Sequence, residues 1–242
     1  MIIIPMAGAS RRFREAGYTK PKYMLPAHGE TLFEHSIKSF ARYFDKLPIL
    51  IIARDVDGTA QFIRERLLAL AIPDARLVLL EHPTQGQAET VALGLNSAVK
   101  GYEGPITIFN IDTIRRGFTF PTWLHECDGY LETFIGTGEN WSFVRPKHDQ
   151  PQYAAETSEK RRISNYCSTG LYYFASSLGF LDAYNLAVRE PPEMRDNGEL
   201  YIAPLYNQLI RRGEAIRYSV IGRDEVVFCG VPQEYENFLG RT

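Results

Sequence analysis

The chain has 242 residues, 45% of them hydrophobic and 23% charged, which is the composition of a folded globular protein and excludes intrinsic disorder. The 27 basic and 29 acidic residues leave a net charge of −2, which argues against a dedicated nucleic-acid binder. Three widely spaced cysteines, with no CxxC pair, exclude a disulfide framework and a structural zinc site. No signal peptide and no apolar run of membrane-spanning length is present, so we expect a cytoplasmic protein.

Strand and helix patterns alternate over the first half of the chain. Continuous aliphatic runs predict strands covered on both faces, and apolar residues at helical spacing predict helices between them. The strands are expected at residues 2–6, 47–53, 75–80 and 105–111, and the helices at 31–44, 57–71 and 86–99. The first helix begins at a capping box formed by Thr31 and Glu34. Four strands that alternate with three helices imply a mostly parallel sheet flanked by helices.

The second half has a mixed pattern. Strands are expected at 129–135, 141–145, 167–174, 216–221 and 225–229, and helices at 176–188, at 198–212 and from Pro232 onward. Residues 189–198 have the composition of a loop rather than of a linker between domains. We therefore expect a single α/β domain of Rossmann-like type over residues 1–242, with a nucleotide-binding half (1–112) and a mixed, acceptor-binding half (113–242).

The most specific motif follows the first strand. Ala7-Gly8-Ala9-Ser10 is a loop of small residues at the carboxyl end of a strand, where ligands bind in open α/β sheets. Such a loop presents backbone N–H groups to phosphate oxygens, and Gly8 permits close approach. It is neither a Walker A motif nor a GxGxxG fingerprint.

Positive charge is concentrated next to this loop. Residues 11–22 contain five basic side chains and one acid, a local charge of +4, which leaves −6 for the rest of the chain. A small positive region on an acidic body suits a compact, highly charged anion such as a triphosphate. Arg12 and Lys22 are the candidate residues for binding it.

The loop, Arg12 and the segment Pro21-Lys22-Tyr23-Met24-Leu25-Pro26 together resemble the signature of the sugar-1-phosphate nucleotidylyltransferases, or sugar-nucleotide pyrophosphorylases, with cytidylyltransferase-like branches. Many members have glycine where this chain has Ser10. The resemblance implies a GT-A-like fold in which Ala7, Gly8, Ala9, Ser10 and Arg11 bind the nucleotide. It also implies that Arg12 binds the β and γ phosphates and that Lys22 holds the α-phosphate as it is attacked.

Further matches follow in the family's order along the chain. Gln85, Gly86 and Gln87 precede a predicted helix, where the family reads the base, although glycine at a helix start is as well explained by a turn. Asp112 is expected to end the fourth strand and to hold Mg²⁺, an ion that prefers oxygen ligands. The alternative is a carboxylate that caps the strand end or the following turn.

The resemblance places the acceptor site in the second half of the chain. Glu159 would bond sugar hydroxyls, Lys160 would bind the acceptor phosphate, and Thr169-Gly170 would let the sugar lie against the backbone. Glu199 resembles a residue near the acceptor. As an isolated cluster, Lys160-Arg161-Arg162 would instead be interpreted as a solvated basic hairpin. An amino-alcohol phosphate acceptor would need acids among aromatic residues, for which Tyr153, Glu156, Trp141 and Glu159 are candidates.

One family residue is absent. Members commonly carry a second metal-binding aspartate in an Asp-x-Gly-Thr-Pro segment near the C-terminus, and this chain has Phe228-Cys229-Gly230-Val231-Pro232 there. Either Asp112, phosphates and water hold Mg²⁺, or Asp224 or Glu225 replaces the aspartate, or catalysis is lost.

These features predict a nucleotidyltransferase that moves a nucleoside monophosphate from a triphosphate to a small phosphorylated acceptor and releases pyrophosphate. Mg²⁺ is the expected cofactor and polysaccharide or capsule precursor synthesis the expected role. No nucleic-acid or membrane partner is expected, and oligomerisation is left open. A nucleotide-sugar-dependent glycosyltransferase is one alternative, although Asn110-Ile111-Asp112 keeps only one acid of a DxD motif. A non-catalytic sugar-nucleotide-binding protein is the other.

Overall fold

The computed structural model describes residues 1–191 and 198–240. Contacts between residues group the chain into two compact units. Unit 1 consists of Met1, Thr84–Ile108 and Phe120–Arg223, and unit 2 consists of Ile2–Pro83, Phe109–Thr119 and Asp224–Thr242. The single domain expected over residues 1–242 stays a prediction.

Unit 2 contains most of the first half of the chain together with its C-terminal segment. Its strands are β1 (Ile2–Met6), β2 (Pro26–Ala27), β3 (Glu30–Thr31), β4 (Ile49–Arg54), β5 (Ala75–Leu80), β7 (Thr113–Arg115) and β13 (Val226–Phe228). Its α-helices are α1 (Arg11–Glu15), α2 (Leu32–Ile37), α3 (Thr59–Ala69) and α7 (Pro232–Leu239). Short 3₁₀ helices are η1 (Lys22–Met24) and η2 (Lys38–Tyr43), and η7 (Arg223–Glu225) begins at the last residue of unit 1.

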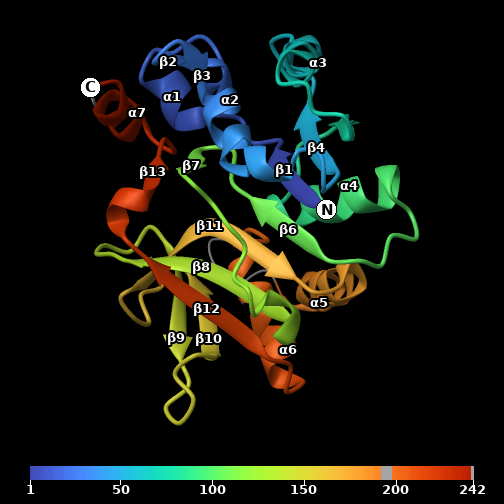
Figure 1. The fold of residues 1–242 in the computed structure, drawn as a ribbon, viewed down its shortest axis with the longest axis vertical. Helices are drawn as coiled ribbons and strands as arrows, with labels where there is room; N and C mark the ends of the chain where they lie inside the picture. The colour runs from blue at the N-terminus through green and yellow to red at the C-terminus, as the bar shows by residue number, and fades with distance from the viewer. Residues whose placement is uncertain (192–197, 241–242) are drawn as a thin grey trace. The chain divides into compact units, whose positions relative to one another are not determined.

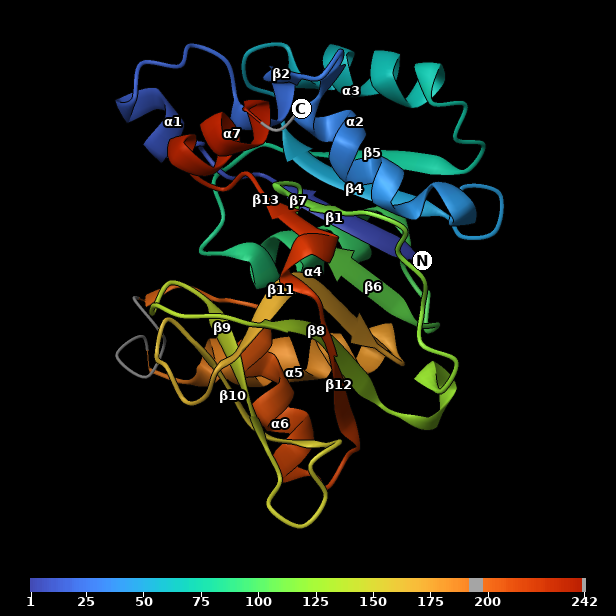
Figure 2. The ribbon, with the colours of Figure 1, turned by 60° about the vertical axis from the view of Figure 1, so that its left-hand side comes forward.

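The parallel sheet of unit 2 has β4 between β1 and β5. Ile2 pairs with Ile49, Ile49 pairs with Ala75, and both ladders are parallel. These strands run side by side in Figure 2, and α3 packs against β4 and β5. Every residue of β1 is buried, as a continuous apolar run predicts for a strand covered on both faces. The strands predicted at 2–6 and 75–80 are confirmed at both ends.

The predicted capping box opens α2. The Thr31 hydroxyl accepts a hydrogen bond from the Glu34 N–H (3.3 Å), and the Glu34 carboxylate accepts one from the Thr31 N–H (2.8 Å). The helix expected over residues 31–44 is divided into α2 and η2, with non-helical backbone at Phe40 (φ −104°, ψ 16°). The Phe40 ring packs edge-on against Phe109 and Phe118.

A hydrophobic cluster joins the start and the end of the chain within unit 2. Figure 2 shows α7 beside α1, and the buried rings of Phe13 and Tyr235 lie 6.2 Å apart with Tyr18 in contact with both. The other cluster members are Leu25, Ala27, Leu32, Ile114, Val227, Cys229 and Phe238. The sequence predicted a loop where α1 lies, because five residues are too few to show helical periodicity. Phe13, which is 1% exposed, anchors this short helix.

Unit 1 contains most of the second half of the chain. Its strands are β6 (Ile106–Phe109, whose last residue belongs to unit 2), β8 (Gly129–Ile135), β9 (Ser142–Pro146), β10 (Ala154–Glu159), β11 (Tyr166–Phe174) and β12 (Ile216–Ile221). Its helices are α4 (Gln87–Ala98), η3 (Leu124–Glu126), α5 (Ser177–Arg189), η6 (Ala203–Leu205) and α6 (Tyr206–Arg211).

The strands of unit 1 form a mixed arrangement, as predicted for the second half. β9 pairs antiparallel with β10 and β11, β8 pairs antiparallel with β11 and parallel with β12, and β6 lies beside β11. Helix α5 packs on β11, and the rings of Phe174 and Tyr206 stack 4.4 Å apart. The fold class is therefore α/β, with parallel βα units early in the chain and a mixed later part. Among the described residues, no helix combines the length and hydropathy that a membrane span needs.

Two predictions for unit 1 need correction. The helix expected from residue 198 begins only at Ala203, because Leu200 forms strand-like backbone hydrogen bonds with Gln85 and Ala88 instead. Strand β10 was not predicted, since Ala-Ala-Glu-Thr-Ser-Glu contains one β-branched residue and no aromatic one. Most of the loop predicted over 189–198 falls on residues 192–197, outside the described residues.

Candidate active site

The loop after β1 presents a run of unused backbone donors. Within the described part of the chain, no protein atom accepts a hydrogen bond from the N–H groups of Gly8 through Arg12. A Cβ built on Gly8 would meet no atom within 4 Å, so this glycine is not required by packing. Consecutive free N–H groups at a strand end form a concave site for an anion. The geometry agrees with the phosphate loop expected at Ala7, Gly8, Ala9, Ser10 and Arg11.

Ser10 stands at a backbone position that favours glycine. Its φ of 51° and ψ of 34° lie in the left-handed region, which explains the glycine that many relatives of this motif carry. The serine side chain adds a contact that glycine lacks, because its Oγ accepts a hydrogen bond from the Lys22 N–H (3.3 Å). This hydrogen bond ties the phosphate loop to the second part of the motif.

The second part of the motif holds Lys22 on a single 3₁₀ turn. Met24 N–H donates to the Pro21 carbonyl (2.9 Å), and Leu25 N–H donates to the Lys22 carbonyl (3.1 Å). Tyr23 is 2% exposed, and its hydroxyl lies 2.7 Å from Thr59 Oγ1. Burial raises the pKa of Tyr23. Because the neighbours on either side of Lys22 are fixed, the lysine backbone is fixed as well.

Asp112 is brought to Lys22 within unit 2. The Lys22 ammonium forms an ion pair with Asp112 Oδ2, and both side chains keep about a fifth of their surface exposed (21% and 23%). The prediction that Asp112 ends the fourth strand is wrong by three residues. Strand β6 ends at Phe109, and Asp112 lies in the following turn, where the Thr113 N–H donates to the Asn110 carbonyl (3.1 Å). The carboxylate still follows the carboxyl end of the strand.

The arginines of the motif differ in their partners. Arg14 forms an ion pair with Asp57 (2.5 Å) and donates a hydrogen bond to the Ala9 carbonyl (3.4 Å), so it stabilises the loop. Arg11 and Arg12 are exposed, and no carboxylate among the described residues lies in ion-pair contact with either of them. The phosphate-binding role expected for Arg12 stays a prediction.

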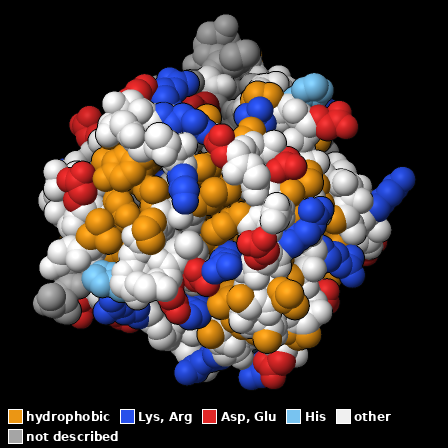
Figure 3. Space-filling view, turned by 90° about the horizontal axis from the view of Figure 1, so that it is seen from above, with side chains coloured by type: hydrophobic (Ala, Val, Ile, Leu, Met, Phe, Trp, Pro, Cys, Tyr) orange, Lys and Arg blue, Asp and Glu red, His pale blue; other side chains and the backbone are white. Residues whose placement is uncertain are grey.

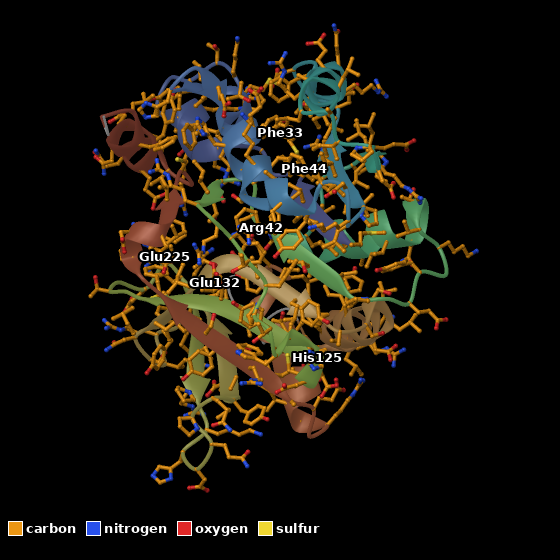
Figure 4. All side chains as sticks on the ribbon, in the orientation of Figure 1. Phe33, Arg42, Phe44, His125, Glu132 and Glu225 are labelled. Atoms are coloured by element: carbon orange, nitrogen blue, oxygen red, sulfur yellow. The ribbon has the colours of Figure 1, made fainter. Side chains whose placement is uncertain are left out.

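The residues near the C-terminus show how the missing aspartate is accommodated. Phe228 is buried in β13, in register with Thr113 of β7. Glu225, labelled in Figure 4, forms an ion pair with Arg115 (3.2 Å), so its carboxylate already has a cationic partner. Cys229 N–H donates to the Asp112 carbonyl (2.8 Å). None of these residues supplies a second acid in contact with Asp112.

Glu234 is an acid that the sequence analysis did not consider. A Cβ built on Gly230 would lie 3.1 Å from Asp112 Oδ2 and 3.5 Å from Glu234 Oε2, so the two carboxylates flank one glycine. Glu234 Oε2 accepts hydrogen bonds from the N–H groups of Gly230 (2.8 Å) and Val231 (3.3 Å). This residue therefore fixes the loop beside Asp112. No group of three or more metal-binding side chains forms within the described residues.

In unit 1, the predicted base-reading segment is anchored to the segment around Glu199. Leu200 N–H donates to the Gln85 carbonyl and Leu200 C=O accepts from the Ala88 N–H, both at 2.9 Å. Gly86 lies between these bonds with φ 148° and ψ −179°, and a Cβ there would come within 2.5 Å of the Leu200 carbonyl oxygen. The glycine is therefore required by this close approach. Glu199 is exposed next to it, and Gln87 begins α4.

Glu159 is the last residue of strand β10, and Lys160 follows it. Glu159 is 7% exposed and accepts a hydrogen bond from the Ser142 hydroxyl, which lies 3.0 Å from the Tyr172 hydroxyl of β11. Lys160 has left-handed backbone (φ 53°), and its ammonium donates to the Tyr201 hydroxyl. The alternative of a solvated basic hairpin does not fit Lys160, because its ammonium has a defined partner.

Thr169 and Gly170 lie in an irregular part of β11. The register with β8 shifts between Ser168 and Tyr172, and Gly170 has φ 90°. The Thr169 hydroxyl lies 3.2 Å from Glu132 Oε1, to which it donates. Glu132, labelled in Figure 4, is a buried carboxylate on β8 that the sequence analysis missed; an acid inside an otherwise apolar strand is the signal that reveals it.

The residues considered for an amino-alcohol acceptor are engaged elsewhere in unit 1. Glu156 forms ion pairs with Arg145 and Arg161, both at 2.5 Å. The Tyr153 ring lies near the cationic ends of Lys147 (5.7 Å) and Arg217 (5.9 Å). Protein cations therefore contact this acid and this ring in the structure.

The described surface agrees with the charge of the sequence. Basic and acidic side chains are interspersed over the face in Figure 3.

Comparisons with known proteins decide the family. The MobA-like NTP transferase domain matches residues 2–120. The structure of a nucleoside-diphosphate-sugar pyrophosphorylase from Vibrio cholerae RC9 is 53% identical, with 100% of both chains covered and a TM-score of 0.96. The chain belongs to the sugar-nucleotide pyrophosphorylase family of nucleotidyltransferases. The comparisons thus confirm the family resemblance of this nucleotidyltransferase. They also confirm the fold class and the enzyme class expected from the sequence.

More distant structures share only the fold with this nucleotidyltransferase. A putative glucose-1-phosphate thymidylyltransferase from Bacillus anthracis is 17% identical, with a TM-score of 0.77 over 98% of this chain and 93% of the other. The inositol-1-phosphate CTP transferase from T. maritima is 14% identical, with a TM-score of 0.72 over 98% and 92%. A search of the curated proteins finds no match.

Proposed function

We propose that this nucleotidyltransferase transfers a nucleoside monophosphate from a nucleoside triphosphate to a sugar 1-phosphate or a similar small polar phosphate and releases pyrophosphate. The observation that carries the proposal is the run of unused N–H groups from Gly8 to Arg12, in a loop whose Ser10 is hydrogen-bonded to the Lys22 N–H. The name of the relative that is 53% identical, a nucleoside-diphosphate-sugar pyrophosphorylase, supports a sugar phosphate as the acceptor.

The reaction is an attack by an acceptor phosphate oxygen on the α-phosphorus. This oxygen is already ionised near pH 7, so the protein need not supply a nucleophile or a strong base. The barrier is electrostatic, because two anions must approach and the leaving pyrophosphate gains charge. In our proposal the loop N–H groups and Arg12 bind the β and γ phosphates, and Lys22 stabilises the charge at the α-phosphate.

Mg²⁺ fits the residues present at this site. The Asp112 carboxylate is partly exposed and already receives a cation, the Lys22 ammonium, at Oδ2. Carboxylate oxygens suit this ion, which commonly binds through one or two carboxylates together with substrate phosphates and water. Asp112 would hold it, while Glu234 fixes the loop at Gly230 beside Asp112. When bound, the ion would neutralise charge that develops on the phosphates.

The acceptor side of the proposal rests on unit 1. Glu159 would bond sugar hydroxyls, Lys160 would bind the acceptor phosphate, and Gly170 would let the sugar approach the backbone. Gln85, Gly86 and Gln87 would read the base. The proposal covers uracil, thymine and cytosine as the base of the triphosphate, and it does not specify the sugar. We further propose a cytoplasmic role in the synthesis of sugar nucleotides for surface polysaccharide or capsule.

A lysine pair in the motif provides the test. Pyrophosphate release is measured over a matrix of triphosphates and phosphorylated acceptors, and then for Lys22→Met and Lys20→Met with the best substrates. Lys20 is an exposed lysine two residues before Lys22, and it makes no ion pair within the described residues. Loss of Lys22 should lower kcat by about two decades or more, since it removes charge stabilisation in the transition state. An unchanged kcat in Lys22→Met, or an equal loss in Lys20→Met, would refute the assignment.

A further inference from the structure

Among the residues that the structure describes, the Lys160 side chain contacts one neutral partner, Tyr201. The Lys160 N–H donates to the Trp141 carbonyl (2.8 Å), which fixes the backbone in its left-handed conformation. The ammonium donates to the Tyr201 hydroxyl and lies 4.6 Å from the centre of that ring. No carboxylate among the described residues is in ion-pair contact with Lys160. The contact therefore orients the ammonium without neutralising it.

This arrangement differs from that of Lys22, whose charge is balanced by Asp112. An ammonium has three N–H donors, so a hydroxyl that accepts one of them leaves two for the oxygens of a phosphate. A lysine side chain has several rotatable bonds and loses rotamer entropy when a ligand fixes it. A partner that fixes the side chain beforehand reduces this cost at the moment of binding.

The backbone position of Tyr201 is fixed through its neighbour Leu200. Leu200 is 4% exposed, and its two hydrogen bonds to Gln85 and Ala88 attach the segment to the start of α4. Gly86 permits this approach because any side chain there would overlap the Leu200 backbone. The same segment therefore contacts the predicted base-reading residues on one side and the predicted phosphate-binding lysine on the other.

We propose that Tyr201 is a positioning residue for the acceptor, which holds the Lys160 ammonium ready for the acceptor phosphate. The inference rests on the proposed function in one respect, namely that Lys160 binds that phosphate. It adds that the hydroxyl of Tyr201, rather than its ring, is the group that matters for acceptor affinity. It also makes the segment 199–201 a direct link between the nucleotide and acceptor halves of the proposed site within unit 1.

A double-mutant cycle tests this role. KM and kcat are measured for the best acceptor with Tyr201→Phe, Lys160→Ala and the double variant. Tyr218→Phe is the matched control, since its hydroxyl donates to the Pro151 carbonyl (2.8 Å), away from the proposed site residues. Tyr201→Phe should raise the KM of the acceptor by about tenfold, the effect of losing a hydrogen bond to a charged group, with kcat and the KM of the triphosphate nearly unchanged. In the Lys160→Ala background the same change should have less than about a twofold effect. Equal effects in both backgrounds would overturn the inference.

A second measurement does not depend on turnover. In protein labelled with ¹³C-lysine, the Lys160 signal is assigned by its loss in Lys160→Ala and followed while inorganic phosphate is titrated. Tyr201→Phe should shift this signal and weaken its response to phosphate, whereas Tyr218→Phe should leave both unchanged. An unaltered Lys160 signal and phosphate response in Tyr201→Phe would overturn the inference. If no triphosphate and acceptor pair releases pyrophosphate, the proposed function fails, and this titration alone decides the role of Tyr201.

Discussion

Replacement of Gly86 by alanine tests the most tightly constrained backbone contact next to the proposed site. The added Cβ would lie 2.5, 2.7 and 2.9 Å from the O, N and C atoms of Leu200, distances that real side chains do not show. The backbone angles of Gly86 (φ 148°, ψ −179°) also fall in a region that is almost exclusive to glycine. The alanine is therefore strained at its own backbone, and the segment at Leu200 also has to move away.

The size of the effect follows from these two contributions. Backbone strain of this kind costs about 1–3 kcal/mol. Displacement of Leu200 would also weaken its hydrogen bonds with Gln85 and Ala88, each of which contributes about 0.5–1.5 kcal/mol. We therefore expect Gly86→Ala to lower the free energy of unfolding by about 2–6 kcal/mol, a large part of the total stability of a typical domain.

The assay is urea unfolding followed by circular dichroism, with Gly8→Ala as the matched control. A Cβ at Gly8 meets no atom, so this variant should stay within about 0.5 kcal/mol of the unsubstituted protein. Gly8→Ala should nonetheless weaken nucleotide binding, because the space it fills is the space proposed for phosphate. An unchanged unfolding midpoint for Gly86→Ala would refute the close approach of Leu200. A large loss for Gly8→Ala would show that its glycine serves packing.

Three further predictions concern stability and reactivity, and the first two are measured by urea unfolding. Thr31→Ala should cost about 1 kcal/mol through loss of the capping box. Burial raises the pKa of Glu34, but hydrogen bonds from Thr31 and the charges of Arg66 and Lys38 outweigh it, so its pKa is lowered from 4.5. The stabilisation by Glu34 is therefore present above about pH 4.5 and lost as the pH falls through the lowered pKa. In urea titrations at acid pH, the free energy of unfolding of Glu34→Gln should approach that of the unsubstituted protein. A difference between the two free energies that persists at low pH would contradict this. Burial raises the pKa of Cys127 and Cys167 to about 11, so at pH 8 only about one in a thousand of each thiol is ionised. These thiols of the folded protein should therefore react slowly with Ellman's reagent. Rapid stoichiometric labelling of both would contradict their burial.

The sequence predicted the phosphate side of the site better than the acceptor side. Gly8, Arg12 and Lys22 lie within fifteen residues and form one motif, so their proximity follows from local structure. Asp112 could be placed with them because the carboxyl ends of parallel strands meet at one edge of a sheet. The partner of Lys22 was not predictable, since an ion pair across ninety residues leaves no periodic signal.

The acceptor side depends on contacts between segments that are distant in sequence. Tyr201 looked like part of a helix, because a strand-like pairing of Leu200 with the start of α4 has no local pattern. Gly86 was equally consistent with a turn and with a base-reading loop, and only the position of Leu200 shows why it must be glycine. Phe228 was recognised as a departure from the family, but its burial in β13 and the engagement of Glu225 by Arg115 required the structure.

The central claim is that the α-phosphate of a nucleoside triphosphate moves to a phosphorylated acceptor. It is tested most directly by parallel reactions with α-³²P- and γ-³²P-labelled triphosphate in the presence of Mg²⁺ and the best acceptor. The proposed reaction transfers the α label to a nucleoside-diphosphate-linked product and releases the γ label as pyrophosphate, in equal amounts. Release of the γ label as inorganic phosphate, or no movement of the α label with any acceptor, would contradict it.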